Sequence, residues 1–270
     1  MIIWLASYPK SGNTWVRAFL SAYLYTTDGS FNIDSLNKIE EFPDHNILGK
    51  FMDSKDFHNL AEVSKHWIKL QELINLKQKN TYLKTHSALC NINKNIFTTS
   101  GTSLAIIYIV RDPRNVILSM SNQFGITQEE SFNNIVNEKH IIYPEMNPLT
   151  LIGSWNHHYL SWKNCNSINK IIIKYEDLIN DSRETFEKII NFLCNRVEIK
   201  NNKEKLINSI NSTHFDKLKK YENKYGFNMG QENKFFHLGK ENDWRHLLDP
   251  KISTKINNQF KLQMQELGYI

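Results

Sequence analysis

Residues 7–15 read Ser-Tyr-Pro-Lys-Ser-Gly-Asn-Thr-Trp, and this stretch decides the fold. The apolar residues 2–6 before it predict a buried strand, and residues 14–25 after it carry apolar side chains at helical spacing. A strand, a tight glycine turn and a helix in succession aim backbone N–H groups at one point, which suits a phosphate. Lys10 adds a positive charge, and donors follow at Ser11, Asn13 and Thr14. An ordinary turn is the alternative interpretation.

Three further short apolar runs, at residues 82–84, 104–110 and 171–173, also predict strands. Their apolar residues are continuous and do not alternate, which is typical of a parallel sheet covered on both faces. Asp181, Ser182, Arg183 and Glu184 predict the start of a helix. Strands that alternate with helices indicate the α/β class, with a central, mostly parallel sheet flanked by helices.

We expect one domain over residues 1–270, because no linker or internal repeat divides the chain. Residues 31–78 are expected to mix helix and loop. Residues 121–150 are polar with scattered aromatic side chains, and we interpret them as a lid or an acceptor-binding insertion.

The loop at residues 7–15 is not a Walker A motif, which requires a glycine four residues before its Gly-Lys-Ser/Thr. Here Lys10 precedes Ser11 and Gly12, and no glycine comes earlier in the chain. A nucleotide kinase is therefore the less favoured hypothesis.

Composition excludes several other classes of protein. The net charge is +5, without a run of Lys and Arg that would indicate a nucleic-acid-binding arm. Three cysteines, without a Cys-x-x-Cys pair, are typical of a reducing compartment. No apolar stretch approaches the roughly 20 residues of a membrane span, and no basic leader precedes the first strand. We therefore expect a cytoplasmic protein without a transmembrane segment.

A second phosphate site is predicted where the strand at 104–110 ends. Arg111 follows this strand, and Pro113 is suited to opening the next helix. Ligands of open α/β sheets bind beyond the carboxyl ends of the strands, where a guanidinium can grip a phosphate with two donors. Ser119 lies about two turns further along that helix. The alternative is that Arg111 forms an ordinary surface ion pair with Asp112 or with another carboxylate.

Residues 7–15 resemble the 5′-phosphosulfate loop of the sulfotransferases, whose usual form is TYPKSGTTW; only Ser7 and Asn13 depart from it. Arg111 with a serine eight positions later resembles the 3′-phosphate motif of the same family. The resemblance implies a P-loop NTPase-like fold and 3′-phosphoadenylyl sulfate (PAPS) as donor. It also implies that Lys10 contacts the phosphosulfate and that five following residues cradle the 5′-phosphate and approach the adenine. These are Ser11, Gly12, Asn13, Thr14 and Trp15.

Lys84, Thr85 and His86 follow the apolar residues Tyr82 and Leu83. A histidine at the end of a strand can act as a general base, although a lone histidine is more commonly structural. In the sulfotransferases a Lys-Thr-His segment stands at this place. The resemblance implies that His86 deprotonates the acceptor and that Lys84 assists the departing group.

The rest of the donor site is implied by resemblance alone. A Tyr-Glu-Asp-Leu segment begins at Tyr175, whose counterpart in the family reaches the adenine side of the donor. Thr213 and Phe215 match a segment that clasps the adenine. Residues 236–245 resemble the closing loop, usually RKGxxGDW. The positions implied there are Leu238, Gly239 and Lys240.

This closing loop departs from the family pattern in its charges. His237 and Leu238 replace the usual Arg and Lys, whereas Gly239, Asp243 and Trp244 are kept. Lys240 or Arg245 is the candidate to compensate for the two missing cations. Without compensation, the donor is expected to bind more weakly, or His237 to make binding depend on pH.

The implied reaction moves a sulfonate group from PAPS to a hydroxyl or amine and releases adenosine 3′,5′-bisphosphate (PAP) by in-line displacement. No metal is expected, because lysines supply the positive charge, and adjacent His157 and His158 cannot share one helix face. The expected acceptor is a small molecule, a glycan or a lipid, bound by residues 31–78 and 121–148. A non-catalytic nucleotide-binding protein remains the alternative of another class. The oligomeric state is not indicated.

Overall fold

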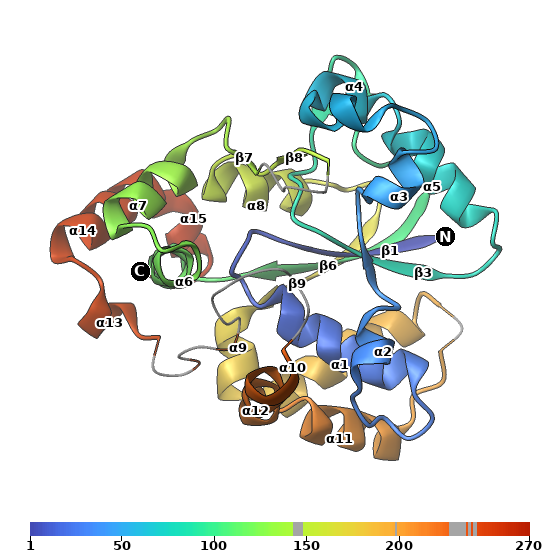
Figure 1. The fold of residues 1–270 in the computed structure, drawn as a ribbon. Helices are drawn as coiled ribbons and strands as arrows, with labels where there is room; N and C mark the ends of the chain where they lie inside the picture. The colour runs from blue at the N-terminus through green and yellow to red at the C-terminus, as the bar shows by residue number, and fades with distance from the viewer. Residues whose placement is uncertain (143–147, 198, 227–235, 237–238, 240–241) are drawn as a thin grey trace. The chain divides into compact units, whose positions relative to one another are not determined.

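The computed structural model describes residues 1–142, 148–197, 199–226, 236, 239 and 242–270. The chain folds into two compact units, which are shown with their labelled elements in Figure 1. The first unit contains Met1–Tyr8, Ile39–Ile109 and Asn137–Ile173. The second unit contains Pro9–Lys38, Val110–Val136 and Lys174–Ile270.

The sheet consists of five strands in the order β2-β3-β1-β6-β9. The central strand β1 runs parallel to β3 and to β6, and β2 runs parallel to β3. These strands are β1 (Ile2–Ser7), β2 (Glu40–Glu41), β3 (Thr81–Thr85), β6 (Ser103–Val110) and β9 (Asn169–Lys174). The four predicted strands each lie within an observed strand, and the α/β class with a parallel sheet is confirmed. Strand β2 was missed because its two glutamates carry no apolar signal.

The remaining elements of the first unit are short, apart from two helices of nine residues. The indole of Trp4 on β1 lies 5.3 Å from the rings of both Phe42 and Phe97, between ring centroids. Trp67 of α5 lies 5.2 Å and Trp162 of α8 lies 6.0 Å from Phe97, so both helices join this aromatic core. The elements are α3 (His45–Leu48), η1 (Ser54–His58), α4 (Leu60–Ser64), α5 (Trp67–Asn75), β4 (Asn91–Ile92), β5 (Asn95–Ile96), β7 (Ile141–Ile142), β8 (Thr150–Leu151) and α8 (Trp155–Lys163).

The described part of the second unit contains helices and no complete strand. Phe19 of α1 stacks on Phe186 of α10 at 3.9 Å between ring centroids. Asp181 caps α10 by accepting a hydrogen bond from the Glu184 N–H at 2.9 Å, which confirms the predicted helix start. The helices are α1 (Asn13–Tyr25), α2 (Ile33–Leu36), α6 (Pro113–Phe124), α7 (Gln128–Val136), α9 (Tyr175–Asn180), α10 (Ser182–Cys194), α11 (Lys203–Ser212), α12 (Phe215–Tyr225), α13 (Trp244–Leu247), α14 (Pro250–Gln259) and α15 (Lys261–Glu266).

Two regions that the sequence left irregular contain several short elements. Residues 31–78 mix helix and loop as predicted, with β2 in addition. Within residues 121–150, α6 ends, α7 follows and β7 pairs with β8; a role as lid or insertion, like the expectation of a single domain, stays a prediction. Among the described helices, none is both long and apolar enough to cross a bilayer.

Candidate functional site

The N-terminus of α1 forms an anion-binding geometry in the second unit. Gly12 is the N-cap residue, with φ of 100°, and no side chain caps the helix. The first N–H groups of a helix have no partner within the helix, so a capless N-terminus offers them to an anion. Lys10 also has a positive φ, of 66°, which turns the chain sharply between β1 and α1.

This loop contains a buried polar group and a glycine that its packing requires. The Ser11 side chain is 0% exposed, and its Oγ has no hydrogen-bond partner within the described parts of the chain. A buried hydroxyl without a partner costs free energy, which a ligand oxygen would recover. A Cβ at Gly12 would collide with the ring of Tyr175, so this position requires glycine.

Arg111, directly after β6, belongs to the same unit as this loop. Its side chain is 5% exposed, and Nη1 donates to the Lys10 carbonyl at 2.9 Å. Its guanidinium lies 4.2 Å from the centre of the Tyr175 ring. Tyr175 therefore contacts both predicted phosphate-binding segments. Asp112, one of the partners considered for Arg111, forms an ion pair with Arg114.

Lys10 and Ser119 complete the predicted phosphate ligands. The Lys10 ammonium donates to Gln123 Oε1 of α6 at 2.9 Å, so α6 contributes a contact that the sequence did not predict. Ser119 lies half-buried on the same helix, one turn before Gln123. Gln123 carried no motif signal and was missed for that reason.

The predicted adenine-side residues gather around Trp15. Its ring centroid lies 6.1 Å from Tyr175 and 5.9 Å from Phe215, and its Nε1 donates to the Thr213 carbonyl at 2.8 Å. The Thr213 hydroxyl donates to the carbonyl of Ser209 at 2.6 Å, so its side chain serves its own helix. The cluster offers aromatic faces and edges of the kind that bind a flat base.

The predicted base, His86, lies in the first unit directly after β3. Its Nδ1 lies 2.9 Å from the Ser7 carbonyl oxygen. Because a carbonyl only accepts, Nδ1 carries the proton and Nε2 is the basic nitrogen. The end of β1 thus selects the tautomer that a general base requires.

His158 is linked to His86, which the sequence did not predict. His158 of α8 is 0% exposed, and its Nε2 donates to the His86 carbonyl at 3.1 Å. Its Nδ1 consequently accepts from the Tyr108 hydroxyl at 2.8 Å. Burial lowers the pKa of His158 to about 3, so it is a neutral support for the His86 backbone.

Lys84 has an acidic partner that the sequence did not indicate. Its ammonium lies 3.2 Å from Glu41 Oε2, and the two residues are register partners on β3 and β2. The ion pair exists because β2 adds a glutamate to the edge of the sheet.

The closing loop is described only in part. Predicted residues His237, Leu238 and Lys240 lie outside the described residues. Gly239 has φ of 57°, and a Cβ there would lie 2.5 Å from the Phe215 ring. Arg245 Nε donates to Asp243 at 2.9 Å, so the candidate compensating cation is engaged locally in an exposed pair.

Asn115 of α6 anchors the last described residues of the closing loop. Its side-chain oxygen accepts from the Trp244 N–H at 3.0 Å, and its carbonyl accepts from Asn242 Nδ2 at 3.3 Å.

Within the described ranges, no group of three His, Cys, Asp or Glu side chains could hold a metal ion.

The sequence and the fold of this chain are similar to those of several known proteins. The chain is 25% identical to flavonol 4′-sulfotransferase of Flaveria chlorifolia, covering 99% of this chain and 80% of that protein. It is 23% identical to 3-alpha-hydroxysteroid sulfotransferase of Cavia porcellus, covering 71% and 58%. The structure is similar to mouse sulfotransferase SULT7A1 complexed with PAP, with a TM-score of 0.63, 22% identity and coverage of 98% and 84%.

A further solved structure with the same fold is retinol dehydratase in a complex with retinol and PAP, with a TM-score of 0.62, 16% identity and coverage of 97% and 81%. The profile of the sulfotransferase domain matches residues 2–268, almost the full length of the sequence. The chain therefore belongs to the sulfotransferase family.

Proposed function

We propose that this protein transfers a sulfonate group from PAPS to a hydroxyl or amine acceptor and releases PAP. The observation that carries the proposal is the buried Ser11 hydroxyl, which lacks a partner among the described residues at the capless N-terminus of α1. Arg111 approaches the same loop through the Lys10 carbonyl. The solved relatives crystallised with PAP support the choice of nucleotide.

The residues of the second unit fit such a donor. Residues 11–15 would cradle the 5′-phosphate, with the backbone N–H groups from Ser11 to Thr14 as donors, and Arg111 with Ser119 would hold the 3′-phosphate. Trp15, Tyr175 and Phe215 would receive the adenine, together with Thr213 and the segment around Gly239. When bound, PAPS supplies an activated sulfonate group. Lys10 would neutralise negative charge that develops on the leaving phosphate.

His86 in the first unit would remove the acceptor proton. Nε2 would take this proton as the acceptor oxygen or nitrogen forms its bond to sulfur and the bond from sulfur to the phosphate oxygen breaks. The hydrogen bond from Nδ1 to the Ser7 carbonyl would then stabilise the imidazolium. The Lys84 ammonium would leave the Glu41 carboxylate and contribute its positive charge to the departing group.

The acceptor class is proposed from the relatives and from the sequence. The relatives named for flavonol and hydroxysteroid substrates favour a small molecule with a hydroxyl group. Residues 31–78 and 121–148 are the proposed acceptor-binding segments. Relatives from Arabidopsis thaliana that are named cytosolic sulfotransferases favour a cytoplasmic location.

Calorimetric titration with PAP tests the donor site. Wild type should bind PAP. Arg111→Ala should weaken binding strongly, because it removes the guanidinium that would hold the 3′-phosphate. Arg183→Ala, at an exposed position on α10, is the matched control and should leave binding unchanged. A wild-type protein without affinity for PAP would contradict the proposal. Binding without transfer to any of a panel of phenols, sterols and amines would instead favour the non-catalytic alternative.

A further inference from the structure

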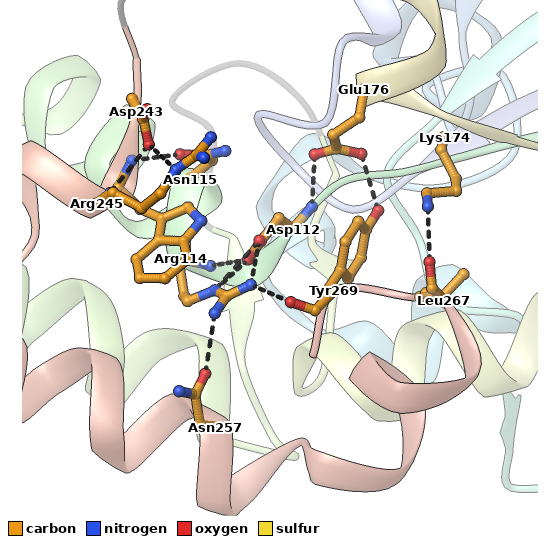
Figure 2. A network of polar contacts seen from close by, with 11 residues as sticks. Asp112, Arg114, Asn115, Lys174, Glu176, Asp243, Arg245, Asn257, Leu267 and Tyr269 are labelled. Atoms are coloured by element: carbon orange, nitrogen blue, oxygen red, sulfur yellow. Dashed lines mark hydrogen bonds and ion pairs between the residues drawn. The ribbon is translucent and has the colours of Figure 1, made fainter.

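A buried polar network in the second unit surrounds the residue that follows Arg111. The Asp112 carboxylate accepts from Arg114 Nε at 2.9 Å and from Nη2 at 2.7 Å, and both residues are less than 5% exposed. Figure 2 shows this ion pair at the N-terminus of α6, with Glu176, Tyr269 and Asn257 around it. The Asp112 side chain also caps α6, because it accepts from the Arg114 N–H.

Arg114 fastens three further segments to this point. Nη2 donates to the Tyr269 carbonyl at 2.7 Å, and Nη1 lies 3.3 Å from Asn257 Oδ1 of α14. Its guanidinium also lies 3.7 Å from the centre of the Trp244 ring. A planar guanidinium with five donors can satisfy all these partners at once, which a lysine cannot do.

Glu176 connects the same network to the stacking partner of Arg111. Its Oε1 accepts from the Asp112 N–H at 3.0 Å, and its Oε2 accepts from the Tyr269 hydroxyl at 2.9 Å. Asp112 is the chain neighbour of Arg111, and Glu176 is the chain neighbour of Tyr175, whose ring lies under the Arg111 guanidinium. One carboxylate therefore bridges the backbone that carries Arg111 and the helix that carries Tyr175.

The turn at residues 267–269 holds this carboxylate in place. Besides the Tyr269 hydroxyl, the Leu267 carbonyl accepts from the Lys174 ammonium at 2.6 Å, and this ammonium lies 4.9 Å from the Tyr269 ring centre. Burial raises the pKa of Glu176, so its charged form depends on its few donors. Tyr269 is one of these donors, and its side chain reaches Glu176 from the turn that follows α15.

We propose that Tyr269 is a positioning residue for the recognition of the 3′-phosphate. Its hydroxyl holds Glu176, and Glu176 holds the Arg111 backbone at a fixed separation from Tyr175. This inference rests on the proposed function, because it assumes that Arg111 binds the 3′-phosphate. It adds a residue far along the chain from every phosphate-binding motif, and it assigns to that residue an effect on one phosphate of the donor.

The test compares PAP with adenosine 5′-monophosphate, which lacks the 3′-phosphate, by calorimetric titration of the full chain. In Tyr269→Phe the affinity for PAP should fall about tenfold, the usual effect of losing a hydrogen bond to a charged group. The affinity for adenosine 5′-monophosphate should change less than about twofold, because this nucleotide has no 3′-phosphate for Arg111 to bind. Tyr225→Phe, at an exposed tyrosine of the same unit, is the matched control and should change neither affinity.

A double-mutant cycle with Glu176→Gln shows whether Tyr269 acts through Glu176. In the Glu176→Gln background, Tyr269→Phe should cause little further loss of PAP affinity, because the bridge is already weakened. Equal losses for both nucleotides, or losses that add fully, would overturn the inference and assign Tyr269 a general stabilising role. If the wild type itself does not prefer PAP to adenosine 5′-monophosphate, the proposed function fails, which is a separate outcome.

Discussion

The backbone at Gly12 has a φ of 100°, a value that side chains with a Cβ rarely adopt, and the Tyr175 ring occupies the place of the missing Cβ. The motif resemblance indicated a glycine here but not the reason for it. The reason is a residue at the start of α9, which packs against the loop and also stacks on Arg111. Gly12 thus links the two predicted phosphate-binding segments by letting one ring reach both.

Gly12→Ala should lower stability and abolish tight binding of PAP. The left-handed backbone alone should cost about 1–2 kcal/mol, and the displaced Tyr175 ring should disturb Arg111 in addition. Gly125→Ala is the matched control, because Gly125 also has a positive φ, of 63°, but no atom of the described residues lies within 4 Å of its added Cβ. Thermal unfolding and PAP titration of both variants provide the measurement. Equal effects on binding would contradict a role for the contact with Tyr175.

His86 has a defined tautomer because its Nδ1–H faces the Ser7 carbonyl. His86→Asn should lower kcat by roughly 10²–10⁴-fold, the usual contribution of a general base, and leave PAP affinity nearly unchanged. The measurement is steady-state sulfonate transfer beside PAP titration. His157→Asn, at an exposed histidine of the same unit, should retain wild-type kcat. An unchanged kcat in His86→Asn would remove His86 from the mechanism.

The strands of this chain differ in how clearly the sequence predicts them. Strands β1, β3, β6 and β9 are recognisable because buried parallel strands are continuous apolar runs. Strand β2 consists of two glutamates at the edge of the sheet. It has no apolar run, and only its backbone pairing with β3 identifies it as a strand. Its Glu41 could be assigned to Lys84 only after the register was known. Local patterns therefore found the sheet, and pairing supplied its edge.

Helix α8 places a neutral histidine against β6 and beneath His86. Burial lowers the pKa of His158 to about 3, whereas in the unfolded chain it lies near 6.5. Between these values the unfolded chain binds one more proton than the folded chain. The free energy of unfolding should therefore fall by about 1.4 kcal/mol per pH unit as the pH drops below 6.5.

The pH dependence of thermal unfolding between pH 7 and pH 5 measures this effect. His158→Gln should be less stable than wild type at pH 7, because two hydrogen bonds are altered, but its stability should fall less steeply with decreasing pH. His157→Gln, one position away on the exposed face, should keep the wild-type slope. A wild-type slope in His158→Gln would mean that another group dominates acid unfolding.

The chain as a whole carries a net charge of +5, and its proposed donor is a polyanion. Affinity for PAP should therefore decrease as salt rises from about 50 to 200 mM, because salt screens exposed charges. The decrease should be shallower in Arg111→Ala, which has one cation fewer at the site. Titrations at four salt concentrations check this, with Arg183→Ala as the control of equal net charge. Parallel slopes for Arg111→Ala and Arg183→Ala would contradict a direct contact between Arg111 and the nucleotide.

The sequence by itself determined the α/β class, the glycine turn before α1 and the family. Those features are local: a continuous apolar run, a glycine before a helix, and motifs in a fixed order. Only the tertiary structure decided that the Ser11 hydroxyl is buried without a partner among the described residues. It also decided that the Tyr175 ring contacts both the Gly12 loop and Arg111. It also decided that Arg114 is held by Tyr269, 155 residues away. Contacts of that kind depend on how the helices pack, which no short window of sequence contains.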